Sequence, residues 1–242
     1  MYDVIRTVHL VDASRASGPV LEHLRSVTGR FTDADVVVAP TLPGARNGGD
    51  ILVRLRFGSA DHWHAHRSTL DEALTHEDIH HVVGASFEST GDGSAGRRAG
   101  PDQPGIYRTM LAKVHPDTPA EQVAAFERAT LQMPRHVPQI RAWQLTRVTD
   151  SVGATDWTHA WEQEYDHVDG LLDSYMNHPI HWAHVDRWFD PEHPLWIVRD
   201  RVVHTFCAID RPVLGVAAPT GDRALPDLLT GGRHTVPRGS GA

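Results

Sequence analysis

The stretch at 156–182 reads Asp-Trp-Thr-His-Ala-Trp-Glu-Gln-Glu-Tyr and, after a short turn, Leu-Leu-Asp-Ser-Tyr-Met-Asn-His-Pro-Ile-His-Trp. Side chains of a strand alternate between its two faces, so a strand over 157–165 places two tryptophans, a histidine and a glutamine on one face. These residues are Trp157, His159, Trp161 and Gln163. Apolar residues then recur at spacings of three and four, which predicts an amphipathic helix that Pro179 interrupts. The stretch therefore predicts a strand followed by a broken helix.

The residues around this stretch supply the other elements of one α+β unit. Apolar alternation predicts further strands at 107–114, 140–148 and 198–209. Thr118 is the expected N-cap of a helix with Pro119 in its first position, and Met133-Pro134 is expected to end that helix. Prolines in the segment 188–196 indicate an inserted loop or lid before the last strand.

The first half of the chain repeats this order. We expect strands at 4–11, 35–39, 51–57 and 81–87, and helices at 19–28 and from Ser59 or Asp61 to about residue 74. Ile5-Arg6-Thr7 also matches Tyr107-Arg108-Thr109. The order β-α-β-β-α-β is the ferredoxin-like unit, so the sequence predicts an α+β fold of two tandem ferredoxin-like repeats.

The repeats are expected at 1–88 and 105–210. Between them, residues 89–104 are rich in glycine and proline and indicate a linker. The C-terminal tail at 211–242 is rich in Gly, Pro and Ala, and its last dozen residues are expected to be disordered. Each repeat leaves one sheet face bare, and two such faces can bury each other as a barrel. The pairing could occur within one chain or across a homodimer.

Composition limits the classes of function. The chain has 242 residues and a net charge of −8, which argues against non-specific nucleic-acid binding. Its single cysteine, Cys207, cannot form an internal disulfide and fits a reducing compartment. No apolar run reaches the ~18 residues of a membrane span, and the first residues lack signal-peptide features. We therefore expect a cytoplasmic protein without a membrane partner.

Several sequence motifs in the second half of the chain resemble those of a known family. They are Trp-Thr-His-Ala at 157–160, Tyr165, Tyr-x-x-His-Pro-x-His at 175–181, and Met-Leu-Ala-Lys-Val-His-Pro-Asp-Thr-Pro at 110–119. Over about 105–209 the chain resembles the stress-responsive A/B barrel family of the dimeric α+β barrel superfamily, in particular members of the olivetolic acid cyclase type. The resemblance implies a dimeric-α+β-barrel-type fold and a ligand pocket in the barrel. The family includes both enzymes and proteins with no known activity.

The resemblance implies catalytic roles for His159, Tyr175 and His181, which match pocket positions of the cyclase. Imidazole can take a proton near neutral pH, and a phenol can hold a developing enolate. The alternatives are that His159 only packs and that His178 and His181 cap backbone groups at a helix start. His159 between two tryptophans is expected to be neutral at pH 7.

A second group of residues is expected to bind the substrate. Arg108 matches a position where the cyclase has a pocket histidine, and Arg6 is its equivalent in the first repeat. An arginine in a cavity suits a carboxylate, although a structural salt bridge would also explain it. The full set of expected substrate-binding residues is Arg108, Arg6, Trp157, Trp161, Trp182 and His178.

The 18 histidines raise the question of metal binding. His62, His64 and His66 alternate, but a helix would place only His62 and His66 on one face. No carboxylate or cysteine cluster with ligand spacing accompanies them, so we expect no metal and no cofactor. Haem is bound by some relatives in the superfamily, and His159 or His181 would be the axial ligand.

Two functions of different class follow. The first is a cofactor-independent lyase, cyclase or isomerase that moves protons on an aromatic or polyketide-like, anionic small molecule, with the tryptophans as an apolar wall. The second is a non-catalytic stress-responsive or ligand-binding barrel protein. A haem-dependent enzyme is a third alternative.

Overall fold

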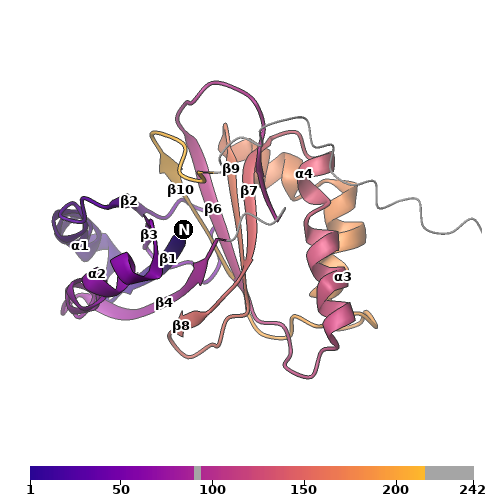
Figure 1. Ribbon diagram of the computed structural model, residues 1–242, viewed down its shortest axis with the longest axis horizontal. Helices are drawn as coiled ribbons and strands as arrows, with labels where there is room; N and C mark the ends of the chain where they lie inside the picture. Colours follow the sequence, from indigo (N-terminus) through magenta and orange to yellow (C-terminus); the bar gives the residue numbers. More distant parts are fainter. Residues whose placement is uncertain (90–93, 216–242) are drawn as a thin grey trace, which may run out of the picture.

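The computed structural model describes residues 1–89 and 94–215. These residues form two five-stranded sheets that face each other, with helices on the outer face of each sheet (Figure 1). The sheet of the first repeat has the order β2-β3-β1-β4-β8, and that of the second has β10-β6-β9-β7-β5. Within both, four antiparallel strands follow the ferredoxin-like order, which confirms the predicted tandem repeat.

The first repeat has the predicted element order. Its elements are β1 (Tyr2–Leu10), α1 (Ala13–Thr28), β2 (Ala34–Pro40), β3 (Ile51–Phe57), α2 (Ala60–Ala73) and β4 (Ile79–Glu88). Asp12 caps α1 by accepting a hydrogen bond from the Ser14 amide, so this helix begins earlier than expected. Ser59 caps α2 in the same way.

The second repeat contains more irregular pieces. Its elements are β6 (Gly105–Ala112), α3 (Ala120–Thr130), α4 (Met133–His136), β7 (Ile140–Arg147), β9 (His159–Tyr165), the π-helices η1 (Gly170–Tyr175) and η2 (His181–Val185), the 3-10 helix η3 (Asp186–Trp188), and β10 (Val203–Ile209). The helix after β9 is broken around Pro179 as predicted, but both halves have π geometry.

Three expectations about this repeat were wrong in detail. Pro119 rather than Thr118 is the N-cap of α3, and it makes no side-chain capping bond. Helix α3 ends at Thr130, slightly before the predicted stop at Met133-Pro134, and these two residues begin the separate short helix α4, where a proline in the first turn is tolerated. The last strand begins at Val203, since Val198 forms an isolated bridge with Val114 instead.

The two repeats exchange edge strands. Strand β5 (Ala95–Arg97) lies in the segment expected to be a linker and pairs with β7, while β8 (Asp150–Val152) comes from the second repeat and pairs with β4. The segment 89–104 is therefore partly a strand. The expected disorder at the end of the tail lies outside the described residues.

The two faces of each sheet pack against different layers of the structure. In the second sheet, Met110, Trp161 and Tyr165 pack against the helices, whereas Tyr107, Leu111 and Ala160 pack against the first sheet. In the first sheet, Val4 and Val53 face α1 and α2, and Ile5 and Leu52 face the second sheet. One chain thus buries both bare faces. Within the described residues no helix is long and apolar enough to cross a membrane.

Candidate functional site

Arg108 is the centre of a buried polar cluster on the helix-facing side of the second sheet. Its side chain is 3% exposed, and its Nη1 donates to Gln163 Oε1 at 2.7 Å. The guanidinium lies 5.3 Å from the centre of the Tyr175 ring. Among the described residues it forms no ion pair with a carboxylate, so the expected structural salt bridge is not found. A buried cation without an anionic partner is costly, which makes Arg108 a candidate for ligand binding.

Tyr175 and His181 reach this cluster from the two π-helices. The Tyr175 hydroxyl accepts a hydrogen bond from Trp161 Nε1 at 3.4 Å, and its ring meets that of His181 edge to face at 4.8 Å. His181 Nδ1 lies 3.2 Å from Asp186 Oδ1, but the two atoms are not aligned for a hydrogen bond. The broken helix therefore brings a phenol and an imidazole to the same side of Arg108.

Several polar atoms around Arg108 are buried without a hydrogen-bond partner among the described residues. They are Arg108 Nε, Gln163 Nε2, Tyr165 Oη and His204 Nε2. Burial holds the pKa of the Tyr165 hydroxyl well above its usual value, so this group keeps its proton. Buried polar groups are almost always paired in native proteins. Such a concentration of donors is suited to a ligand that carries acceptor oxygens.

His159 lies on the same face but in a different environment. It sits opposite Ala112 on β6, roughly 13 Å along the strand from Arg108 at about 3.3 Å per residue. Its Nε2 is 3.2 Å from Glu127 Oε1, its Nδ1 is 2.8 Å from Thr158 Oγ1, and its ring meets Phe126 edge to face. The structure therefore does not bring His159 to Tyr175 and His181.

Glu127 connects His159 to the surface. Its pKa is lowered to about 2 by the hydrogen bond with His159 and by Arg147, so the carboxylate is ionised near neutral pH. Together with Leu131 and Leu145 it lines a cavity of about 510 Å³. His159, which was expected between two tryptophans, therefore contacts a carboxylate as well as the ring of Phe126.

Four of the expected substrate-binding residues lie outside the Arg108 cluster. Trp157 precedes β9 and packs between the sheets, because the strand begins only at His159. Trp182 is 59% exposed. His178 is partly exposed, and its Nδ1 accepts a hydrogen bond from the Ile180 amide, as the capping alternative expected.

Arg6 belongs to the first repeat, where it donates to Ala85 O and Ser86 Oγ and lies over the Trp63 ring. Burial lowers the pKa of Arg6 to about 10.

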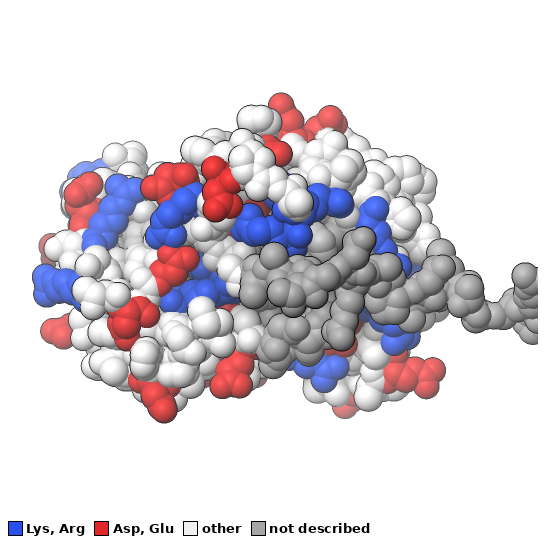
Figure 2. All heavy atoms as spheres, turned by 45° about the horizontal axis from the view of Figure 1, so that its top comes forward, with Lys and Arg blue, Asp and Glu red and all other residues white. Residues whose placement is uncertain are grey.

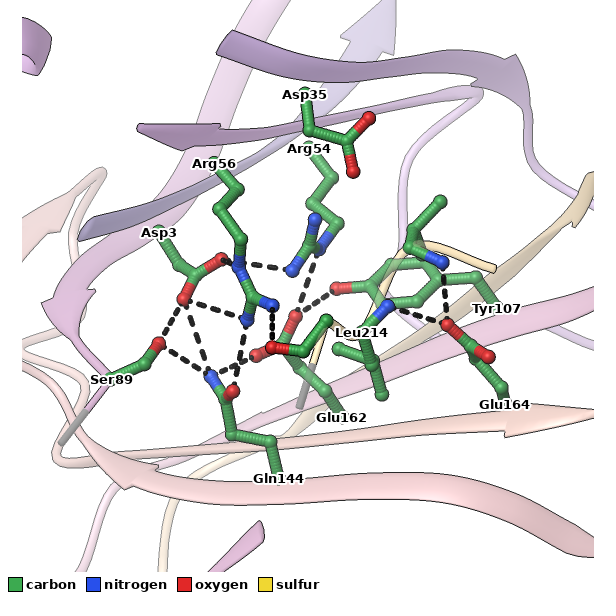
Figure 3. Close-up of polar contacts among 12 residues, drawn as sticks. Asp3, Asp35, Arg54, Arg56, Ser89, Tyr107, Gln144, Glu162, Glu164 and Leu214 are labelled. Carbon is green, nitrogen blue, oxygen red and sulfur yellow. Dashed lines mark hydrogen bonds and ion pairs between the residues drawn. The ribbon is translucent and has the colours of Figure 1, made fainter. Parts of the chain in front are cut away.

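A second polar centre lies between the two sheets. The sequence analysis expected the ligand pocket at this place. Figure 3 shows Arg54 between two carboxylates, with Nη2 2.8 Å from Asp3 Oδ1 and Nε 3.2 Å from Glu162 Oε1. Arg56 also donates to Asp3 and to Gln144 Oε1, and Tyr107 donates to Glu162. The residues come from both repeats and are almost fully buried.

The charges in this inter-sheet network compensate one another. Burial raises the pKa of Asp3, but Arg54 and Arg56 outweigh it and leave that pKa lowered. For Glu162 burial dominates and raises the pKa despite the same two arginines. Glu164 accepts the amides of Val213 and Leu214 at 2.7 and 2.5 Å, which fixes the chain after β10. Because its ions are matched within the protein, we assign this network to the joining of the two repeats.

Comparison with known families decides what the second repeat is. Residues 106–203 match the model of the Stress responsive A/B Barrel Domain. The second repeat is a stress-responsive A/B barrel domain. No curated protein matches the chain significantly.

Solved structures share the fold over most of the chain. The chain is similar to an anthrone oxidase-like protein, with 12% identity, a TM-score of 0.58 and coverage of 87% of this chain and 92% of the other. It is similar to a putative monooxygenase from Lactobacillus acidophilus NCFM, with 8% identity, a TM-score of 0.51 and coverage of 88% and 99%. A putative monooxygenase from Fusobacterium nucleatum subsp. nucleatum gives 8% identity, a TM-score of 0.51 and coverage of 88% and 94%. At these identities the likeness shows the fold alone.

Sequence reasoning did not single out Tyr165 or His204 as site residues, or Glu127 as the partner of His159. The alternation of β9 already put Tyr165 on the face of Trp161 and Gln163, and the β10 register puts His204 opposite Met110.

No group of three or more His, Cys, Asp or Glu side chains among residues 1–89 and 94–215 is placed to hold a metal ion. Basic and acidic side chains lie next to one another on the face in Figure 2.

Proposed function

We propose that the second repeat binds an anionic aromatic or polyketide-like small molecule beside Arg108 and catalyses a proton transfer on it without a cofactor. The observation that supports this most is the buried Arg108 guanidinium, which has no carboxylate partner among the described residues and is surrounded by unpaired donors. An anionic group of the ligand would neutralise the arginine. The rings of Trp161, Tyr165 and Tyr175 offer apolar surface for an aromatic body.

The roles of the two groups from the π-helices follow from their chemistry. His181 takes a proton from a carbon next to a ligand carbonyl, the C–H electron pair moves to the carbonyl oxygen, and the Tyr175 hydroxyl donates a hydrogen bond to that oxygen. Asp186, 3.2 Å from His181, stabilises the imidazolium that forms. Return of the proton to another atom completes an isomerisation, a cyclisation or an elimination.

Arg108→Lys tests the anion site. Lysine keeps the charge but loses the planar fork, so an aromatic carboxylate such as benzoate should bind about tenfold to a hundredfold more weakly, which corresponds to the ~1.5–3 kcal/mol of hydrogen bonds to a charged group. Isothermal titration calorimetry with benzoate measures the change. The matched control is Arg6→Lys, the equivalent position of the first repeat, which should leave affinity unchanged. Equal affinity in wild type and Arg108→Lys would contradict the proposal.

The first alternative is a non-catalytic ligand-binding protein. It would bind the same kind of ligand beside Arg108 and would differ only in having no turnover. A haem-dependent enzyme would need a free axial imidazole, and both ring nitrogens of His159 already contact protein groups. His181 is the remaining candidate from the sequence, and an absorbance spectrum of the purified protein tests it directly. The Arg108 guanidinium, which has no carboxylate partner among the described residues, favours an organic anion over haem, and only turnover distinguishes an enzyme from a binding protein.

A further inference from the structure

His204 is a histidine of the Arg108 cluster to which the proposed proton transfer gives no role. It lies on β10 directly opposite Met110, so its side chain shares the helix-facing side of the sheet with Arg108. Its Nε2 is buried and has no hydrogen-bond partner among the described residues. Its ring packs at 5.7 Å from that of Phe206. A polar ring atom is thus held beside the candidate anion site with unused hydrogen-bonding capacity.

The backbone of His204 is fixed from both sides. One neighbour is β6, and the other is the loop of the first repeat between β2 and β3. From this loop the Arg46 amide donates to His204 O at 2.8 Å, and the His204 amide donates to Arg46 O at 2.9 Å. The Leu42 amide likewise donates to Phe206 O at 2.9 Å. The first repeat therefore helps to position a residue of the Arg108 cluster in the second repeat.

The charge state of His204 follows from its surroundings. Burial, and then the nearby Arg108 and His181, lower its pKa to about 3. The ring is consequently neutral at every pH at which the protein would be assayed. A neutral imidazole has one donor and one acceptor nitrogen, so it suits a hydroxyl or carbonyl group of a ligand rather than a second anionic group.

We propose that His204 is a specificity-determining residue that hydrogen-bonds a neutral hydroxyl or carbonyl oxygen of the ligand, next to the anionic group that Arg108 holds. This rests on the proposed function and narrows its substrate class to aromatic acids with a hydroxyl or carbonyl substituent close to the carboxylate. Arg108 selects for charge, and His204 selects for the second oxygen.

The test compares two probes that differ by one hydroxyl group. Benzoate and 2-hydroxybenzoate are titrated into wild type, His204→Phe and His204→Gln by isothermal titration calorimetry. In wild type the hydroxylated probe should bind about tenfold more tightly, a preference equivalent to one hydrogen bond. His204→Phe should abolish the preference while benzoate affinity changes by less than about threefold, and His204→Gln should restore part of it. His184→Phe, an exposed histidine of η2, is the control and should keep the preference.

The outcomes separate the two proposals. If benzoate binds and depends on Arg108 but both probes bind alike in wild type, or the preference survives in His204→Phe, the role of His204 is overturned and the anion site stands. If neither probe binds to wild type, the proposed function fails and the role of His204 fails with it. Thermal unfolding of each variant confirms that it is folded before titration.

Discussion

Replacing Arg54 by methionine is expected to lower the free energy of unfolding by about 3–5 kcal/mol, the usual cost of removing one partner from a buried ionic network. Arg54 is fully buried and bridges Asp3 of the first repeat to Glu162 of the second. Its loss leaves Arg56 as the one arginine paired with Asp3 among the described residues, and it leaves Glu162 without its closest cation. Guanidinium denaturation followed by tryptophan fluorescence measures the change.

An exposed arginine provides the matched control. Arg15 pairs with Asp78 of the same repeat at 3.8 Å, and its side chain is 82% exposed, so Arg15→Met should cost no more than about 1 kcal/mol. Adding Glu162→Gln to Arg54→Met should recover part of the loss, because the unpaired buried carboxylate is removed as well. A loss below about 1 kcal/mol in Arg54→Met would show that the network does not hold the repeats together.

The same network explains why unlike repeats pair. The first repeat presents two arginines and one aspartate to the interface, and the second presents Glu162 and Tyr107. Two copies of the first repeat would set arginines against arginines in a buried layer, which is strongly unfavourable. Complementary charge thus favours the barrel within this chain over a symmetric pairing of equal halves.

The element order was predictable because apolar alternation and helical spacing are local. The strand at 51–57 was predicted with its observed bounds, and its sequence Ile-Leu-Val-Arg-Leu-Arg-Phe shows why. Val53, Leu55 and Phe57 face the helices, so the strand is specified by its own residues. The three-residue strands β5 and β8 were not predictable, because each is defined only by pairing with a distant strand.

The polar layer between the sheets could not be inferred from either strand alone. Arg54 and Arg56 occupy alternate positions that look like a solvent-facing side, and only the packing of the second sheet buries them. The available signal was the opposite charge of Glu162 and Glu164 on the corresponding strand of the second repeat. The sequence analysis predicted the ligand pocket between the two sheets. Arg108, Tyr175 and His181 instead meet on the other face of the second sheet, under the helices.

Tyr175→Phe and His181→Gln are expected to slow proton transfer by about 10²–10⁴-fold while leaving ligand affinity within a few-fold of wild type. Tyr175→Phe removes one hydrogen-bond donor and almost no volume, and His181→Gln removes the base. The probe is 2-acetylbenzoate, whose carboxylate can bind Arg108 and whose adjacent methyl ketone can form an enolate. Exchange of its methyl protons with D₂O, followed by NMR, measures proton transfer directly, and calorimetry with the same probe measures affinity.

His159→Gln tests in the same D₂O-exchange assay whether His181 or His159 acts as the base. Because His159 is bonded to Glu127 and lies roughly 13 Å from Arg108 along the sheet, its replacement should leave the exchange rate within a few-fold of wild type. Exchange that is lost in His159→Gln and retained in His181→Gln would move the chemistry to the Glu127–His159 pair and its surface cavity. Wild-type exchange no faster than that in buffer would instead favour a binding protein, since the Arg108 cluster would then hold the carboxylate without acting on the neighbouring carbon.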